Sequence, residues 1–167
     1  MYQKLKTQIA AICFSLAITG IACIAHAKEK IMTTAIQHIS VSINRKPQEV
    51  YTYAANPENL PKWAAGLAGA KIHREGDIWI SDSPMGKVKI KFAAKNDFGV
   101  LDHDVTIPTG ETTHNAFRVI PNNDGSEVVF SIVRNAKMSD EEFKKDTAQI
   151  KKDLEKLKLV LEAQRES

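Results

Sequence analysis

Apolar and polar residues alternate along much of the chain after residue 35, which predicts a protein rich in β-strands. In residues 35–43, Ile39, Val41 and Ile43 share one face and polar side chains occupy the other. In residues 87–92, lysines alternate with Val88, Ile90 and Phe92. Each pattern is typical of a strand with one buried face and one solvated face.

Further strand-like stretches follow one another from residue 70 with only turn residues between them. The predicted strands after the first are residues 70–75, 77–82, 87–95, 100–107, 112–121 and 127–134. Their separators are rich in glycine, asparagine, aspartate and proline, and none is long enough for a helix. Short strands joined by tight turns predict consecutive antiparallel hairpins.

Two short helices are predicted between the first strand and the second. Pro47 is suited to the first position of a helix, where its missing N–H costs nothing. Asn56 and Pro57 repeat this arrangement and predict a second short helix that carries Leu60 and Trp63.

The chain ends in a predicted long helix. Ser139 and Glu142 have the spacing of a capping box, which marks the helix start. A single apolar stripe then follows, at steps of three and four residues, through Phe143, Thr147, Ile150, Leu154, Leu157 and Leu161. The lysine and glutamate runs beside this stripe are interpreted as solvated surface.

These elements predict an α+β fold in which a curved, seven-stranded antiparallel sheet wraps around the C-terminal helix. One helix is about 10 Å wide, much narrower than such a sheet. The two short helices are expected to close one end, and a space is expected to remain between the sheet and the long helix. A space of this kind is a candidate ligand cavity.

The first 27 residues have the pattern of a secretory signal peptide. Lys4 and Lys6 precede an apolar run, which ends in the small residues Ala25 and Ala27 at a cleavage-site spacing. We therefore expect cleavage after Ala27, a short linker over residues 28–34, a domain over residues 35–167, and a periplasmic or secreted location. The alternative is an uncleaved N-terminal membrane anchor; a lipoprotein site at Cys23 fits poorly.

Cleavage would change the composition of the mature chain. Cys13 and Cys23 would both be removed, which leaves no disulfide, no thiol nucleophile and no cysteine metal ligand. The two leader lysines would be lost as well, and 21 basic residues would remain against 20 acidic ones. This near-neutral balance disfavours a nucleic-acid partner, and no stable membrane insertion is expected after cleavage.

The segments SINRKPQEVY (residues 42–51) and NPENLPKW (residues 56–63) resemble the opening of SRPBCC superfamily domains. These START-like, helix-grip proteins include a polyketide cyclase/dehydrase-like branch, to which the chain is most similar. The resemblance extends over most of the predicted domain, because the order of elements agrees to the last helix. It implies the helix-grip fold and a cavity for a small hydrophobic molecule or lipid, and it transfers no catalytic mechanism.

His103 is the strongest candidate for chemistry in the sequence. It shares a predicted strand face with Leu101, Val105 and Ile107, where an imidazole could shuttle protons or could be a hydrogen-bonded core residue. Arg118 could bind an anionic head group or form a structural ion pair. The candidate ligand-binding residues are Trp63, Trp79, Phe92, His103, Phe117 and Arg118, with the reservation that large aromatic residues are commonly core.

No known catalytic or cofactor motif is found. His38, His73 and His114 lie on separate segments without metal-ligand spacing, and neither a nucleophile elbow nor a phosphate loop is present. We therefore expect no metal and no cofactor. The leading hypothesis is an exported binding protein for a small hydrophobic or amphipathic ligand. The alternatives are a cyclase or dehydratase that uses His103 as acid or base on a polyketide-like carbonyl substrate, and an envelope accessory protein without a ligand.

Overall fold

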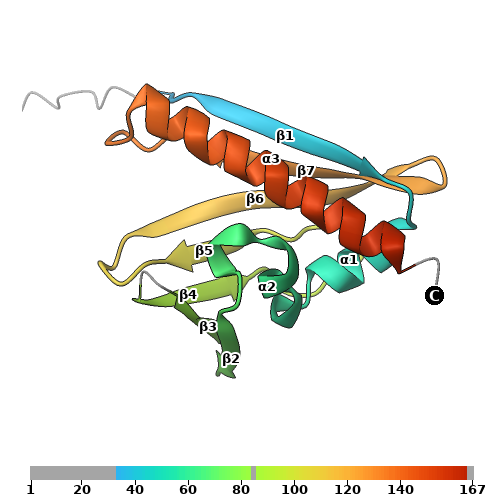
Figure 1. The fold of residues 1–167 in the computed structure, drawn as a ribbon, viewed down its shortest axis with the longest axis horizontal. Coiled ribbons are helices and arrows are strands. Elements are labelled where there is room, and N and C mark those ends of the chain that lie inside the picture. The colour runs from blue at the N-terminus through green and yellow to red at the C-terminus, as the bar shows by residue number, and fades with distance from the viewer. Residues whose placement is uncertain (1–32, 84–85, 165–167) are drawn as a thin grey trace, which may run out of the picture. The chain divides into compact units, whose positions relative to one another are not determined.

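A seven-stranded antiparallel sheet forms the body of the computed structural model, which describes residues 33–83 and 86–164. The strand order is β1-β7-β6-β5-β4-β3-β2, so that β1, the first strand, lies beside β7, the last (Figure 1). The strands are β1 (Ile36–Ile43), β2 (Lys71–Glu75), β3 (Ile78–Ser83), β4 (Gly86–Phe92), β5 (His103–Thr106), β6 (Thr112–Asn122) and β7 (Gly125–Val133). The predicted fold class, a helix-grip α+β fold, is confirmed.

The connection from β1 to β2 is helical, as predicted, and has one more turn than expected. It contains α1 (Pro47–Ala54), η1 (Pro57–Asn59), α2 (Leu60–Trp63) and η2 (Ala65–Leu67). Pro47 occupies the start of α1, and the Asn56 side chain accepts a hydrogen bond from the backbone N–H of Glu58 at the start of η1. The unexpected turn, η2, extends the cover of the sheet beyond Trp63.

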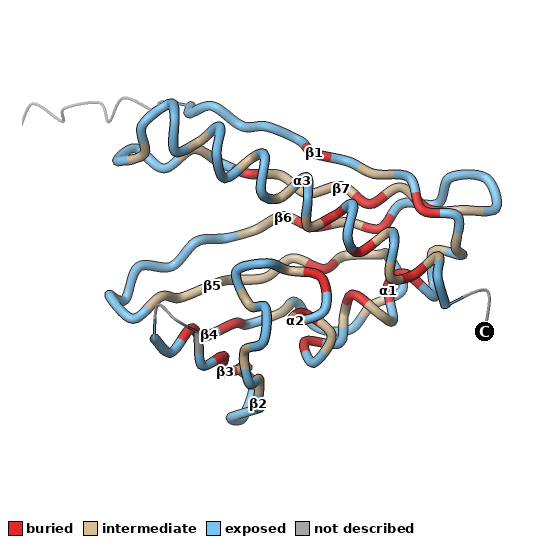
Figure 2. The backbone as a smooth tube through the Cα atoms, viewed as in Figure 1, coloured by how far each residue is buried: buried red, intermediate tan, exposed pale blue. Residues whose placement is uncertain are grey.

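Helix α3 (Asp140–Ala163) packs over only part of the sheet. Ser139 and Glu142 form the predicted capping box at its start. The helix contacts β1, β7 and α2, and in Figure 1 it runs along the β1–β7 side. Leu154, Leu157 and Leu161 are buried, all in its C-terminal half (Figure 2). The N-terminal half is less deeply packed, although the sequence stripe continues through it.

Strand β5 is shorter than the predicted strand over residues 100–107. Val100 makes an isolated bridge to Arg118, and the regular ladder begins only at His103. The side chain of Asn96 explains the delay, because its Oδ1 accepts hydrogen bonds from Phe98 N and Val100 N. These bonds hold the preceding segment in a turn rather than an extended strand.

The predicted leader, residues 1–27, lies outside the described residues. Within the described part of the chain, no helix is long and apolar enough to cross a membrane.

Candidate functional site

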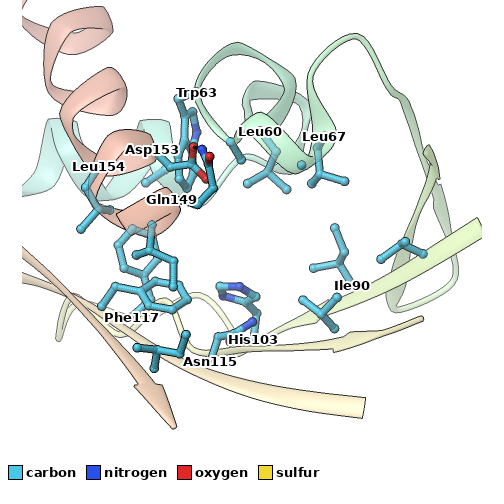
Figure 3. Close-up of a pocket in the computed structure, with 18 of the residues that line it drawn as sticks. Leu60, Trp63, Leu67, Ile90, His103, Asn115, Phe117, Gln149, Asp153 and Leu154 are labelled. Carbon is cyan, nitrogen blue, oxygen red and sulfur yellow. Dashed lines mark hydrogen bonds between the residues drawn. The ribbon is translucent and has the colours of Figure 1, made fainter. Parts of the chain in front are cut away.

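A cavity of about 420 Å³ lies between the inner face of the sheet and the helices. Strands β4 to β7 supply its floor, and the α2–η2 segment and α3 supply its other walls. Most of the lining is apolar, as shown by Leu60, Leu67, Ile90, Phe117 and Leu154 in Figure 3. Apolar walls with a few polar groups are the usual lining of small-molecule sites.

The floor contains a row of three side chains contributed by adjacent strands. Phe92 on β4 pairs with His103 on β5, and His103 pairs with Asn115 on β6. Directly opposed residues of antiparallel strands point to the same face, and all three line the cavity. The imidazole and the amide therefore lie together on an otherwise apolar floor.

The His103 ring is held by a hydrogen bond and by aromatic neighbours. Its Nδ1 lies 3.0 Å from the carbonyl oxygen of Leu101, which can only accept, so Nδ1 donates and Nε2 of the neutral ring is an acceptor. The ring centres of Phe92, Phe130 and Phe117 are 5.0, 6.2 and 6.4 Å from that of His103. Burial lowers the pKa of His103, and the bond to Leu101 opposes this shift in part.

A second polar group lies across the cavity from the first. Trp63, Gln149 and Asp153 gather on the helical side, opposite His103 and Asn115 (Figure 3). Asp153 Oδ1 accepts hydrogen bonds from Ala65 N at 3.2 Å and from Gln149 Nε2 at 2.9 Å. Burial raises the pKa of the Asp153 carboxyl against these two bonds. The Trp63 indole N–H is buried and has no hydrogen-bond partner among the described residues.

The family follows from a comparison of the sequence with known protein families. Residues 36–162 match the model described as "Polyketide cyclase / dehydrase and lipid transport". The chain belongs to this family. The match spans the region from the start of β1 almost to the end of α3, and it confirms the SRPBCC resemblance that the segments after residue 42 indicated.

Solved structures share the helix-grip fold of this family member at low sequence identity. The Aha1 dimer from Colwellia psychrerythraea matches with a TM-score of 0.62 and 14% identity over 76% of this chain and 96% of that one. Ara h 8.0201 matches with a TM-score of 0.58 and 13% identity, over 78% and 99%. DynU16, from the dynemicin biosynthetic locus, matches with a TM-score of 0.60 and 13% identity, over 76% and 47%. The search of curated proteins gives no match.

Four of the six candidate ligand-binding residues lie on the cavity wall of this polyketide cyclase / dehydrase family member, namely Trp63, Phe92, His103 and Phe117. Trp79 and Arg118 are not among the lining residues. Trp79 pairs with Ile90 and packs against the core beside the cavity. Arg118 forms an ion pair with Asp102.

Several polar lining residues were not anticipated from the sequence. Asn115 lies in a polar stretch of β6, and Asp146, Gln149 and Asp153 lie on the last helix outside its apolar stripe. A signal for the helical residues was present: they recur at steps of three and four, beside Ile150 and Leu154 of the apolar stripe.

The partly buried His103 is expected to make folding less favourable in mild acid. An unfolded chain protonates this histidine near its ordinary pKa of 6.5, whereas the folded chain does so only at lower pH. Between the two values the unfolded state binds more protons, so the free energy of unfolding falls as pH falls below 6.5. His103→Gln should flatten this dependence in urea denaturation measured between about pH 7 and 5.

The control is His73→Gln, which removes an exposed histidine from β2. It should leave the pH dependence of the wild type in place. An equal slope in the wild type and in His103→Gln would contradict the interpretation of His103 as a partly buried, neutral histidine.

Proposed function

We propose that the protein is an exported binding protein that holds a small hydrophobic or amphipathic molecule in the cavity between the sheet and α3. The observation that carries the proposal is the cavity itself: about 420 Å³ with mainly apolar walls. Volumes of roughly 300–1,000 Å³ are usual for small-molecule sites, so this cavity suits a small ligand. The family description, which includes lipid transport, supports the same class of ligand.

The polar groups orient the ligand rather than react with it. His103 Nε2 is an acceptor, and the Asn115 amide offers both donors and acceptors, so together they suit a hydroxyl or carbonyl group. A catalytic histidine is commonly oriented by a carboxylate that hydrogen-bonds to its ring. No carboxylate hydrogen-bonds to the ring within the described chain; of the two adjacent acids, Asp104 bonds to His114 and Asp102 pairs with Arg118. Binding is therefore favoured over a cyclase or dehydratase reaction.

Export is supported by the charged start, the apolar run and the alanine cleavage site of residues 1–27. A protein in that location would hold an apolar molecule outside the cytoplasm, where the unfavourable exposure of apolar surface to water keeps its free concentration low. The full chain should therefore be expressed with its leader in a bacterial host and recovered from the periplasm. A mass corresponding to residues 28–167 is expected.

The recovered protein is then titrated with N-phenyl-1-naphthylamine, a neutral apolar dye that fluoresces in apolar surroundings. Val105 lines the cavity and pairs with Ile90 across the floor. Val105→Phe adds ring volume at that position and should weaken dye binding by about tenfold or more, because a ligand cannot share filled space.

The matched control is Val129→Phe, the same change on β7 at a position that does not line the cavity. It should bind the dye like the wild type. Absence of dye binding by the wild type, or equal loss in both variants, would refute the assignment of the cavity as the binding site.

A further inference from the structure

The imidazole and the amide on the cavity floor have hydrogen-bonding capacity that the chain itself does not use. His103 Nδ1 donates to the Leu101 carbonyl oxygen, but neither His103 Nε2 nor the Asn115 amide has a partner within the described chain. In that part of the chain, the side-chain atoms that lack both a partner and accessible surface are Tyr53 Oη, Trp63 Nε1 and Ser81 Oγ. Nε2 and the amide are not among them, so both can meet a ligand in the cavity that their residues line.

The two groups are close enough to bind the same ligand atom. His103 on β5 is directly opposed to Asn115 on β6. Such residues have their Cβ atoms about 4.5–5.5 Å apart on one face of a sheet. Figure 3 shows the two side chains next to each other on the floor. An oxygen atom placed between them can reach both Nε2 and the amide.

The tautomer of His103 determines which kind of oxygen fits. Because Nδ1 carries the hydrogen, Nε2 can only accept and needs an O–H from the ligand. Burial lowers the pKa of His103, so the ring stays neutral and Nε2 stays an acceptor at neutral pH. A hydroxyl donates to Nε2 and accepts from the Asn115 amide, whereas a carbonyl or ether oxygen only accepts and leaves Nε2 unpaired. An acceptor left unpaired on burial weakens the complex.

The charged side chains of the cavity lining are acidic. Asp146 and Asp153 carry carboxyl groups, and none of the described lining residues is a lysine or an arginine. A ligand carboxylate at the floor would lose its hydration with no cation to replace it, and its oxygens would face the acceptor Nε2. The floor therefore suits a polar group without charge.

The position of this polar pair also sets the direction in which a ligand lies. The exposed residues of the lining are Gly66 on η2 and Asp146 and Gln149 on α3, so the cavity opens on its helical side. His103 and Asn115 lie across the cavity from Gln149, on the strands (Figure 3). A ligand that bonds to them has its polar end at the floor and its apolar body toward the opening.

We infer that the ligand is a neutral hydroxyl compound, bound with its hydroxyl between His103 and Asn115 and its apolar body against the walls of the cavity. This ligand class rests on the proposed function, because it specifies what the same cavity binds. The hydroxyl gains two hydrogen bonds, and the apolar walls bury the rest of the molecule. A carboxylic acid of equal length is disfavoured, since its anionic end has no favourable position at the floor.

The test uses three competitors of bound N-phenyl-1-naphthylamine that share one chain, namely 1-dodecanol, its methyl ether and dodecanoate. Each is kept below its solubility or aggregation limit at neutral pH. The ratio of the dissociation constant of the ether to that of the alcohol is measured in each protein, so that a change in dye affinity cancels. His103→Leu removes the acceptor and should lower this ratio by about five- to tenfold, as expected for one neutral hydrogen bond. In the wild type, dodecanoate should compete roughly tenfold more weakly than 1-dodecanol.

The matched control is His38→Leu, the same change on β1 at an exposed position outside the cavity, where Nδ1 lies 2.7 Å from Ser131 Oγ. It should keep the ratio of the wild type. If His103→Leu does not fold, the ¹⁵N resonance of His103 Nε2 in the wild type gives a second readout. It should move when 1-dodecanol binds, because Nε2 then accepts a hydrogen bond, and it should not move in this way with the ether.

Three results would overturn the inference and leave the proposed function intact. They are a ratio that is unchanged in His103→Leu or falls equally in His38→Leu, an Nε2 resonance that both compounds shift equally, and dodecanoate as potent as 1-dodecanol. Failure of the wild type to bind the dye would instead remove the proposed function itself.

Discussion

Replacement of Gly99 by alanine is expected to lower the free energy of unfolding by about 3–5 kcal/mol, in the range reserved for severe backbone or core defects. Gly99 has a φ of 70°, which L-residues with a side chain rarely adopt. A Cβ at this position would also overlap the carbonyl oxygen of Val119. The added Cβ is fixed to the backbone of residue 99, and the oxygen it meets belongs to the backbone of Val119. The two cannot separate without breaking the hydrogen bond from Val119 N to Gly99 O.

Gly69→Ala is the control for the backbone conformation alone. Gly69 has nearly the same φ, 71°, but a Cβ there meets nothing within 4 Å. The loss in this variant should be about 1–2 kcal/mol, the cost of a left-handed conformation. Urea denaturation followed by tryptophan fluorescence measures both variants. Equal losses of unfolding free energy in the two variants would mean that the close approach of Gly99 to β6 does not contribute to the destabilisation.

The position of Gly99 also matters for the site. It ends the turn that follows β4 and leads into Leu101 and His103. Asn96 stabilises the same turn, since its backbone N–H donates to the Tyr51 hydroxyl and its side chain bonds to Val100. The turn therefore ties α1 to the entry of β5, the strand that carries His103 to the cavity floor.

The sequence predicted the fold well because the fold depends on short-range patterns. Alternation at period two identified the strands, and the stripe from Phe143 to Leu161 identified α3. The capping box at Ser139 located the start of that helix. These signals are local, and antiparallel hairpins between neighbouring segments then leave little choice of topology.

The site was predicted less completely because it depends on contacts between distant segments. Phe92, His103 and Phe117 face the cavity because strand alternation places them on the inner face. The same alternation places Arg118 on the opposite face from its buried neighbours Phe117 and Val119. That Asp102 pairs with it follows from the β5–β6 packing, which no local pattern encodes.

The existence of the cavity was inferred from the mismatch between a broad sheet and a single covering helix. The positions of the polar groups could not be inferred in the same way. Trp63 and Asp153 come together because the α2–η2 segment docks against α3, as the hydrogen bond from Ala65 N to Asp153 shows. A one-turn helix such as η2 has no clear sequence signature, so this docking was not predicted.

Leu154→Ala and Leu157→Ala are each expected to lower the free energy of unfolding by about 2–5 kcal/mol, because each truncates a buried leucine. They differ in what lies beside the deleted atoms. Leu154 borders the ligand cavity, so its truncation enlarges an existing hollow. Leu157 is fully buried and does not line the cavity, so its truncation leaves a separate void in the core.

If the cavity holds the ligand chain, comparison of the two variants separates the effect of lost core packing from the effect on ligand binding. Competition with N-phenyl-1-naphthylamine by 1-octanol and 1-dodecanol measures the chain-length preference of each variant. Leu154→Ala should shift the preference toward 1-dodecanol, because the added volume is continuous with the space for the chain. Leu157→Ala should keep the wild-type preference despite a similar loss of stability. A shift of equal size in both would mean that long chains exploit loosened packing of α3, and the cavity wall would then not determine which chain length is bound.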